Sequence, residues 1–240
     1  MPSQPICQVA YLGTVEYRRA WDLQLSVADQ VRRGERPNTL LLLDHPPVYT
    51  LGRLSKPEHL LFDQAELEAR GISVYETDRG GQVTFHGPGQ LVAYPVVDLR
   101  AWGGPVKYVR TLEQVIINTL GDLEIQAHLV EGLTGVWVNG VWVNGPVHEA
   151  KIAAIGVKIS RGVAFHGLSI NMNTDLSYYE NIVPCGIEDR PVTSMARVLG
   201  HSLDEEAVRY SLAYQFGRAM GFSMSEVDAA AVTGSLAEKS

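Results

Sequence analysis

The chain is organised around one stretch, residues 77–90, which reads Thr77-Asp78-Arg79-Gly80-Gly81-Gln82-Val83-Thr84-Phe85-His86-Gly87-Pro88-Gly89-Gln90. Val83 and Phe85 alternate with polar neighbours, a pattern that predicts a short strand. Glycines flank this strand at both ends, and because glycine has no Cβ atom, a ligand or a second backbone can approach closely there. We therefore expect a strand with open backbone at either end, preceded by the cation Arg79 and ended by the imidazole of His86.

The same glycines are also compatible with two ordinary tight turns around a strand. Two phosphate-binding motifs are excluded. The stretch lacks the Gly-Lys-Ser or Gly-Lys-Thr ending of a Walker loop. It is not a dinucleotide fingerprint either, because no long helix can begin at Gly87-Pro88-Gly89 and continue into the strand-like residues 91–97.

The bulk composition is that of an ordinary globular protein, with 240 residues, 45% hydrophobic and 20% charged. We expect residues 1–222 to form a single catalytic domain. No apolar run is long enough to span a bilayer, and residues 1–5 do not resemble a signal peptide. The two cysteines, Cys7 and Cys185, favour a reducing cytoplasm over a disulfide. The net charge of −7 argues against nucleic acid as a partner.

Helices and strands alternate irregularly along the chain. Thr14 is a plausible N-cap for an amphipathic helix that ends near Arg33, and a second amphipathic helix is expected over residues 107–123. Ser202 and Glu205 form a capping-box pattern for a helix that ends at Gly221. The remaining expected elements are a short helix at residues 63–70 and strands at residues 7–12, 39–43, 48–51, 73–77, 91–97, 151–160 and 163–171. This order predicts the α+β class, with a mixed, largely antiparallel sheet and flanking helices.

Two further features of the sequence are a short duplication and a polar C-terminal segment. The sequence Val-Trp-Val-Asn-Gly occurs twice in succession, at residues 136–140 and 141–145, and Asn-Gly between apolar runs predicts a hairpin. A local duplication that lengthens this hairpin is the simplest interpretation, since two copies are too few for a solenoid. The small, polar residues 223–240 predict a flexible C-terminal tail.

Cys185 is the best candidate for a nucleophile. Pro184 and Gly186 place it in a turn, where a thiol is more accessible than within a strand, whereas Cys7 fits a buried position in the first strand. A thiol needs a nearby cation to be ionised at neutral pH. The candidate cations are Lys151, Arg79, Lys158, His86 and His166, and Lys151 is the most interesting because small apolar residues follow it.

The two histidines allow other interpretations. His86 and His166 each precede a glycine, and either can be a structural imidazole held by hydrogen bonds. A zinc site made of both histidines and Cys185 is conceivable, but no closely spaced pair of ligands supports it. The serine elbow of esterases, Gly-x-Ser-x-Gly, is absent from the sequence.

Together the motifs resemble those of the lipoyl(octanoyl) transferases, which are octanoyl-[acyl-carrier-protein]–protein octanoyltransferases of the biotin and lipoate ligase superfamily. The resemblance covers roughly residues 8–222, and several motifs in series are more specific than one glycine pattern. The matching blocks are, in order, Leu40-Leu41-Leu42-Leu43-Asp44-His45-Pro46-Pro47-Val48-Tyr49-Thr50-Leu51-Gly52, residues 78–92, Lys151-Ile152-Ala153-Ala154-Ile155-Gly156-Val157, Phe165-His166-Gly167-Leu168-Ser169-Ile170-Asn171 and Ile182-Val183-Pro184-Cys185-Gly186-Ile187.

This resemblance implies a biotin/lipoate ligase-like catalytic domain that requires no cofactor and no metal. It implies transfer of an octanoyl group from octanoyl-acyl carrier protein to a lysine of a lipoyl domain, the first step of endogenous protein lipoylation. The implied acceptors are the lipoyl domains of 2-oxoacid dehydrogenase complexes and the glycine cleavage H protein. The resemblance also implies that the acyl carrier protein is acidic, so the surface around the site should carry a basic rim. The candidates for this rim are Lys56, Lys107, Arg110, Lys158 and Arg161.

The resemblance also assigns roles to residues. Cys185 would be the nucleophile that forms the acyl-enzyme, and Lys151 its partner, which lowers the pKa of the thiol and moves protons. The hairpin insertion before Lys151 leaves these motif residues intact. The residues implied to line the acyl and thioester site are Arg79, Gly80, Gly81, Gln82, Val83, Thr84, Phe85, His86, Ala154, Ile155, Gly156, Gly167, Leu168 and Ser169.

Two other functions remain open at this point. An ATP-dependent lipoate or biotin ligase would have the same fold, but it needs a basic, glycine-rich loop for phosphate and no cysteine nucleophile; a requirement for ATP and Mg²⁺ would identify it. A catalytically silent acyl-binding module would keep its function after Cys185→Ser.

Overall fold

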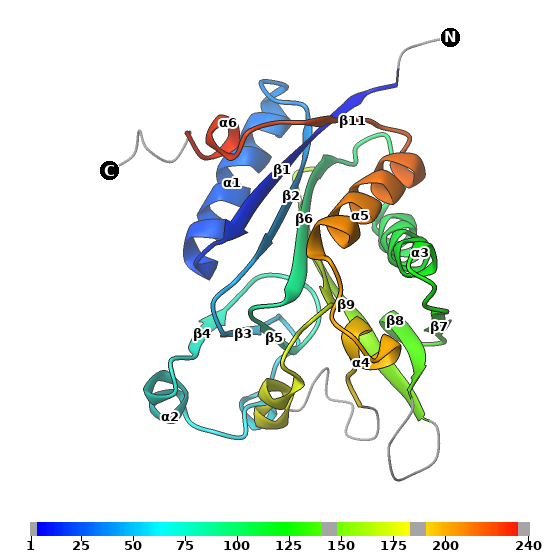
Figure 1. Cartoon of the computed structure of the whole chain (residues 1–240). Helices are drawn as coiled ribbons and strands as arrows, with labels where there is room; N and C mark the ends of the chain where they lie inside the picture. Colours follow the sequence, from blue (N-terminus) through cyan, green and yellow to red (C-terminus); the bar gives the residue numbers. More distant parts are fainter. Residues whose placement is uncertain (1–3, 141–147, 183–190, 235–240) are drawn as a thin grey trace.

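The computed structural model describes residues 4–140, 148–182 and 191–234, which form two sheets and their surrounding helices (Figure 1). The elements are β1 (Ile6–Thr14), α1 (Tyr17–Arg33), β2 (Asn38–Asp44), β3 (Val48–Leu51), the 3₁₀ turn η1 (Pro57–His59), α2 (Gln64–Ala69), β4 (Ser73–Glu76), β5 (Val83–His86), β6 (Gln90–Asp98), α3 (Pro105–Asp122), β7 (His128–Val130), β8 (Leu133–Gly140), β9 (His148–Ser160), β10 (Val163–Asn171), the 3₁₀ turn η2 (Leu176–Asn181), α4 (Met195–Leu199), α5 (Glu205–Met220), β11 (Ser223–Glu226) and α6 (Ala229–Thr233).

The large sheet has the strand order β11-β1-β2-β6-β10-β9-β8-β7. Its β1 pairs in parallel with both β2 and β11, and the other pairs are antiparallel. The small sheet has the order β4-β3-β5 and is also mixed. The predicted α+β class with a largely antiparallel sheet is therefore confirmed.

Helices cover both faces of the large sheet. In Figure 1, α1 and α6 lie on one side of it, and α3 and α5 lie together on the other. The leucines of β2 alternate between these two layers: Leu40 and Leu42 belong to the core under α3 and α5, whereas Leu41 and Leu43 belong to the core under α1. This explains why β2 reads as a continuous apolar run, since both of its faces are buried.

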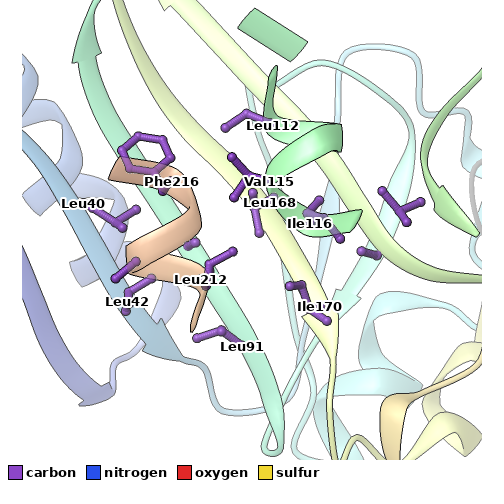
Figure 2. Close-up of a cluster of buried hydrophobic side chains, with 14 of the residues drawn as sticks. Leu40, Leu42, Leu91, Leu112, Val115, Ile116, Leu168, Ile170, Leu212 and Phe216 are labelled. Carbon is purple, nitrogen blue, oxygen red and sulfur yellow. The ribbon is translucent and has the colours of Figure 1, made fainter. Parts of the chain in front are cut away.

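The larger core lies between α3, α5 and the sheet. Figure 2 shows Leu112, Val115 and Ile116 of α3 directed toward Leu168 of β10 and its neighbours, with Leu212 and Phe216 of α5 beside them. The side chain of Leu112 is fully buried in this layer. Burial of such side chains contributes about 1.5–3 kcal/mol each, so this helix layer is a main source of stability.

Helix starts differ from the predicted ones in two places. The N-cap of α1 is Glu16, whose carboxylate accepts from Arg18 N (3.0 Å) and Arg19 N (2.9 Å), while Thr14 is the last residue of β1. The N-cap of α5 is Asp204 rather than Ser202, because the Asp204 carboxylate accepts from Glu206 N at 3.0 Å. In both cases an acidic side chain two residues further along accepts hydrogen bonds from free backbone N–H groups.

The C-terminal region also differs from its prediction. Ser223–Glu226 forms β11, which extends the large sheet beside β1, and Val232 of α6 is fully buried against the layer under α1. The prediction of a flexible tail beginning at residue 223 is therefore wrong as far as residue 234. Its apolar anchors, Val227 and Val232, are too widely spaced to be recognised as a periodic pattern.

The predicted hairpin falls partly outside the described residues. β8 ends at Gly140 and pairs antiparallel with β9, which begins at His148, so the two strands of the hairpin are present. The second copy of the duplicated sequence, residues 141–145, lies outside the described residues. Within the described part of the chain, none of the helices combines the length and the hydrophobicity that crossing a bilayer requires.

Replacement of a residue in the core under α3 tests the layer assignment. We expect Leu112→Ala to lower the free energy of unfolding by about 2–5 kcal/mol, because the substitution leaves a cavity under α3. The matched control is Val106→Ala on the same helix, where the side chain is 74% exposed and the change should stay within about 0.5 kcal/mol. Urea unfolding followed by circular dichroism measures both, and equal effects of the two substitutions would contradict the assignment.

Candidate active site

A small cavity lies where the two sheets meet. It encloses about 20 Å³. Its lining comes from α1, β5, β6, β9 and β10, so segments far apart in the sequence meet here. The lining residues are Tyr17, Arg79, Thr84, His86, Tyr94, Ala154, Gly156, His166, Gly167, Leu168 and Ser169.

Eight of the predicted acyl-site residues line this cavity, and six do not. Val83 and Phe85 belong to the core of the small sheet, where the ring of Phe85 stacks on Tyr178 at 4.6 Å between ring centroids. Ile155 packs against the larger core. The other residues outside the lining are Gly80, Gly81 and Gln82, which form the turn before β5. The alternation of β5 explains the split, because Thr84 and His86 face the cavity while their neighbours face the other way.

Arg79 is buried in the wall of the cavity and is held by the backbone around it. Its Nη2 donates to Thr50 Oγ1 (2.8 Å) and its Nη1 donates to Gly80 O (3.0 Å). A Cβ atom at position 52 would lie 2.7 Å from Nη1, so only the glycine at this position leaves room for the guanidinium. Arg79 therefore places a fixed positive charge at the edge of the cavity.

His86 is a neutral imidazole with a defined tautomer. Burial, followed by the charges of His45 and Arg79, holds the pKa of His86 well below its usual value, against the opposing effect of Gln90. Gln90 uses its amide NH₂ group to donate to Phe85 O (3.1 Å) and Asn171 Oδ1 (2.8 Å). Its Oε1 atom therefore accepts from His86 Nδ1–H at 2.7 Å, which leaves Nε2 without a proton.

His166 is held from two sides. Its Nε2–H donates to Asp78 Oδ1 (2.8 Å), and its backbone N–H donates to Gln24 Oε1 (2.8 Å). Burial lowers the pKa of His166, while the hydrogen bond from His166 holds the pKa of Asp78 below its usual value. The residue adopts a left-handed backbone with φ of 55°, which is strained for a residue other than glycine. Strained backbone of this kind clusters at active sites and ligand-binding residues.

Lys151 lies in β9, buried beside the cavity. Its Nζ atom lies 5.3 Å from the centroid of the Trp137 ring, and a Cβ atom at position 135 would lie 2.6 Å from its Cε. Lys151 lines a second small cavity that shares Thr84, Ala154 and Ser169 with the first. The amine therefore reaches the site from the side of β8 and β9.

The backbone of Lys151 pairs with the chain that follows the predicted nucleophile. Lys151 N donates to Pro191 O (2.9 Å), and Thr193 N donates to Lys151 O (2.9 Å). Cys185 itself lies outside the described residues, within the segment 183–190. The structure thus brings Lys151 together with the lining residues and with one end of that segment.

Several residues of the site were not predicted from the sequence. Tyr94 and Tyr17 line the cavity, and His45 lies behind them, where its Nε2 accepts from Tyr94 O–H (2.7 Å). Burial lowers the pKa of His45 to about 4, so this imidazole is neutral at physiological pH. His45 belongs to the His-Pro-Pro block that resembles the family, so the sequence could have indicated it. Tyr17 and Tyr94 lie within an ordinary amphipathic helix and an ordinary strand, where the sequence pattern does not distinguish a site residue from a core residue.

Comparison with known proteins identifies the family. Residues 16–217 match the family described as lipoyl protein ligase A/B catalytic domain. The chain is 51% identical over 214 residues to an octanoyltransferase of Koribacter versatilis, covering 88% of this chain and 82% of that protein. It is 48% identical over 211 residues to an octanoyltransferase of Chloroflexus aurantiacus, covering 87% and 92% respectively.

Solved structures share the fold at low sequence identity. A lipoate-protein ligase A bound with ATP has a TM-score of 0.74 and 18% identity, covering 97% of this chain and 92% of that chain. The protein Ta0514 of T. acidophilum, a putative lipoate protein ligase with bound lipoic acid, has a TM-score of 0.72 and 16% identity, covering 97% and 93%. The family match and the sequence relatives together show that the chain belongs to the lipoyl protein ligase A/B catalytic domain family and, within it, to the octanoyltransferases.

Proposed function

We propose that this enzyme moves an octanoyl group from the thioester of acyl carrier protein to a lysine of a lipoyl domain through an acyl-enzyme on Cys185. The observation that carries the proposal is the position of Lys151. Its buried amine lies beside the cavity, and its backbone pairs with Pro191 and Thr193, directly after the segment that contains Cys185. We place the reaction in the cytoplasm, where a free thiol stays reduced.

The proposed reaction has two acyl transfers that balance without a further reagent. The thiolate of Cys185 attacks the carbonyl carbon of the octanoyl thioester, and the carrier's thiol leaves with a proton from the Lys151 ammonium. The neutral amine of the acceptor lysine then attacks the cysteine thioester, and Lys151 takes the proton that this amine loses. Exchange between thioesters is nearly neutral in free energy, so the covalent intermediate divides the transfer into two easier steps.

Apart from Arg79 at its edge, the cavity supports an apolar acyl group more than a charged ligand. Leu168, Ala154 and the neutral rings of His86 and His166 form much of its wall. Each buried methylene of the acyl chain contributes about 0.8 kcal/mol of binding free energy, which favours an eight-carbon chain by a graded amount over shorter ones. The enclosed volume of about 20 Å³ has room for one water molecule, so lining side chains must move apart to admit the chain.

An ATP-dependent ligase is the second candidate, because the structural relatives include a lipoate-protein ligase A bound with ATP. At 18% identity that likeness concerns the fold alone. The relatives at 51% and 48% identity carry the octanoyltransferase name instead. Octanoyl transfer from the carrier thioester without ATP and Mg²⁺ separates the two functions.

The first prediction concerns the nucleophile. Incubation with octanoyl-acyl carrier protein should add one octanoyl mass to the intact protein, and peptide mass spectrometry should locate it on Cys185. Cys185→Ala should remove the adduct and the transfer activity. Cys7→Ala is the matched control and should keep both, because Cys7 is fully buried and burial raises the pKa of its thiol to about 12. Full transfer by Cys185→Ala would refute the nucleophile.

The second prediction concerns the ionisation of that thiol. A neighbouring ammonium lowers the pKa of a thiol by about 1–3, so Lys151→Ala should raise the pH midpoint of Cys185 alkylation by at least about one pH unit. The measurement is the iodoacetamide alkylation rate of Cys185 as a function of pH. The matched control is Lys158→Ala on the same strand, where Nζ lies 3.9 Å from Asp78 Oδ2; a midpoint that moves with Lys158 and not with Lys151 would reject the pairing.

A further inference from the structure

A groove much larger than the acyl cavity lies beside it on the small sheet. It has a volume of about 750 Å³, which is in the range of about 300–1,000 Å³ typical of ligand sites. It is formed by the end of β3, the chain around η1, the start of α2 and the end of β4. The lining residues are Leu51, Gly52, Arg53, Ser55, Lys56, Leu60, Leu61, Phe62, Asp63, Glu76 and Thr77.

One wall of the groove is shared with the acyl cavity. Arg53 N donates to Arg79 O (3.1 Å), and Leu54 N donates to Gly81 O (3.0 Å), so the chain along the groove pairs with the chain that carries Arg79. The guanidinium of Arg79 packs against Gly52. A molecule in the groove is therefore separated from the acyl cavity by a single layer of chain.

The opposite wall is tied to the chain that leads into Cys185. Leu60 forms an isolated antiparallel bridge with Ile182, and Leu61 N donates to Asn181 O (3.0 Å). Ile182 precedes Cys185 by three residues, a span of at most about 11 Å of extended chain. The groove thus lies next to the chain that leads toward the proposed nucleophile, as well as next to the cavity.

The groove combines an apolar wall, positive charges and hydrogen-bonding groups. Leu51, Leu60 and Phe62 form the apolar part. Arg53 and Lys56 are exposed cations in the same short segment. Ser55 and Thr77 also belong to the lining and carry hydroxyl groups.

The negative charges of the groove are partly committed elsewhere. The Asp63 carboxylate caps α2 by accepting from Glu66 N at 2.8 Å. Glu58 lies 3.7 Å from Lys56 in an exposed pair, which is weak. Glu76 at the end of β4 is the remaining carboxylate of the lining. The guanidinium of Arg70 adds a third cation behind the groove, 4.0 Å from the centroid of the Phe62 ring.

We propose that this groove binds the phosphopantetheine arm of the acyl carrier protein, an inference that rests on the proposed function. The arm has an apolar dimethyl group, two amides and a phosphodiester, which match the leucine and phenylalanine wall, the polar groups and the cations. Its thioester end lies at the wall that is bridged to Ile182, from which the chain continues to Cys185. Its phosphodiester lies at Arg53 and Lys56, where the attached carrier protein remains outside the groove.

The test measures how much the phosphate group of a small thioester accelerates loading of Cys185. The probes are octanoyl-4′-phosphopantetheine and octanoyl-pantetheine, which differ only in the phosphate. The readout is the rate of octanoyl adduct formation on Cys185 under single-turnover conditions, followed by mass spectrometry. Loading from octanoyl-acyl carrier protein is the positive control for the function itself.

For the unmodified enzyme we expect the phosphate to increase the loading rate about tenfold at low ionic strength. The double variant Arg53→Ala/Lys56→Ala should reduce this advantage to about twofold or less. Both side chains are exposed, so the substitutions should not disturb folding. The matched control is Arg209→Ala. Arg209 lies on α5 with its guanidinium over the ring of Tyr11 in β1, outside the lining of the groove, so this variant should keep the full phosphate effect.

The outcomes are distinguishable. If the carrier protein loads Cys185 but the phosphate has no effect, or if the double variant keeps the effect, the groove assignment is overturned while the proposed function stands. If octanoyl-coenzyme A loads Cys185 as fast as octanoyl-acyl carrier protein does, the proposal that the bound arm belongs to the carrier protein is overturned. If no thioester loads Cys185, the proposed function fails, and the groove assignment fails with it.

Discussion

The close approach of two glycines joins the two sheets and creates the site. Gly80 N donates to Val157 O (3.0 Å), and a Cβ atom at Gly156 would lie 2.9 Å from Gly80 O. This contact brings the turn before β5 against β9, so the small sheet lies directly at the edge of the cavity. A side chain at position 156 would push the two backbones apart and would displace Arg79, which a Cβ atom there would also contact at 3.1 Å. The cavity, the position of Arg79 and the shared wall of the groove all depend on this contact.

A chain of hydrogen bonds connects the two halves of the site. It runs from His86 through Gln90 to Asn171, with distances of 2.7 and 2.8 Å. Asn171 Nδ2 then donates to Thr193 O (3.0 Å), and Thr193 pairs with the backbone of Lys151. Each link in this chain has a defined donor and acceptor, and together the links hold the imidazole of His86 and the backbone beside Lys151 relative to each other. Buried networks of this kind specify one arrangement when they are fully satisfied.

Much of the arrangement around the site was predictable, because its signals are local. Val83–His86 and Val163–Asn171 form the expected strands, and both histidine–glycine pairs lie near the same cavity. Of the stretch 79–86, the cavity lining includes Arg79, Thr84 and His86. A strand directs alternate side chains to opposite faces, and which face meets the cavity depends on how the small sheet docks. Pattern alone could not separate Thr84 and His86 from Val83 and Phe85, because all four are buried.

The sequence alone determined the class of the fold, the leucine-rich central strand and the family, since these depend on periodicity and on motifs that are contiguous in the chain. Only the tertiary structure decided which residues meet: Tyr17 from α1, Tyr94 from β6 and His166 from β10 converge with the predicted motifs. It also decided that Ser223–Glu226 joins the sheet instead of fraying. The physical reason is that these contacts are long-range: a pairing partner or a cavity wall more than a hundred residues away leaves no periodic trace in the local sequence.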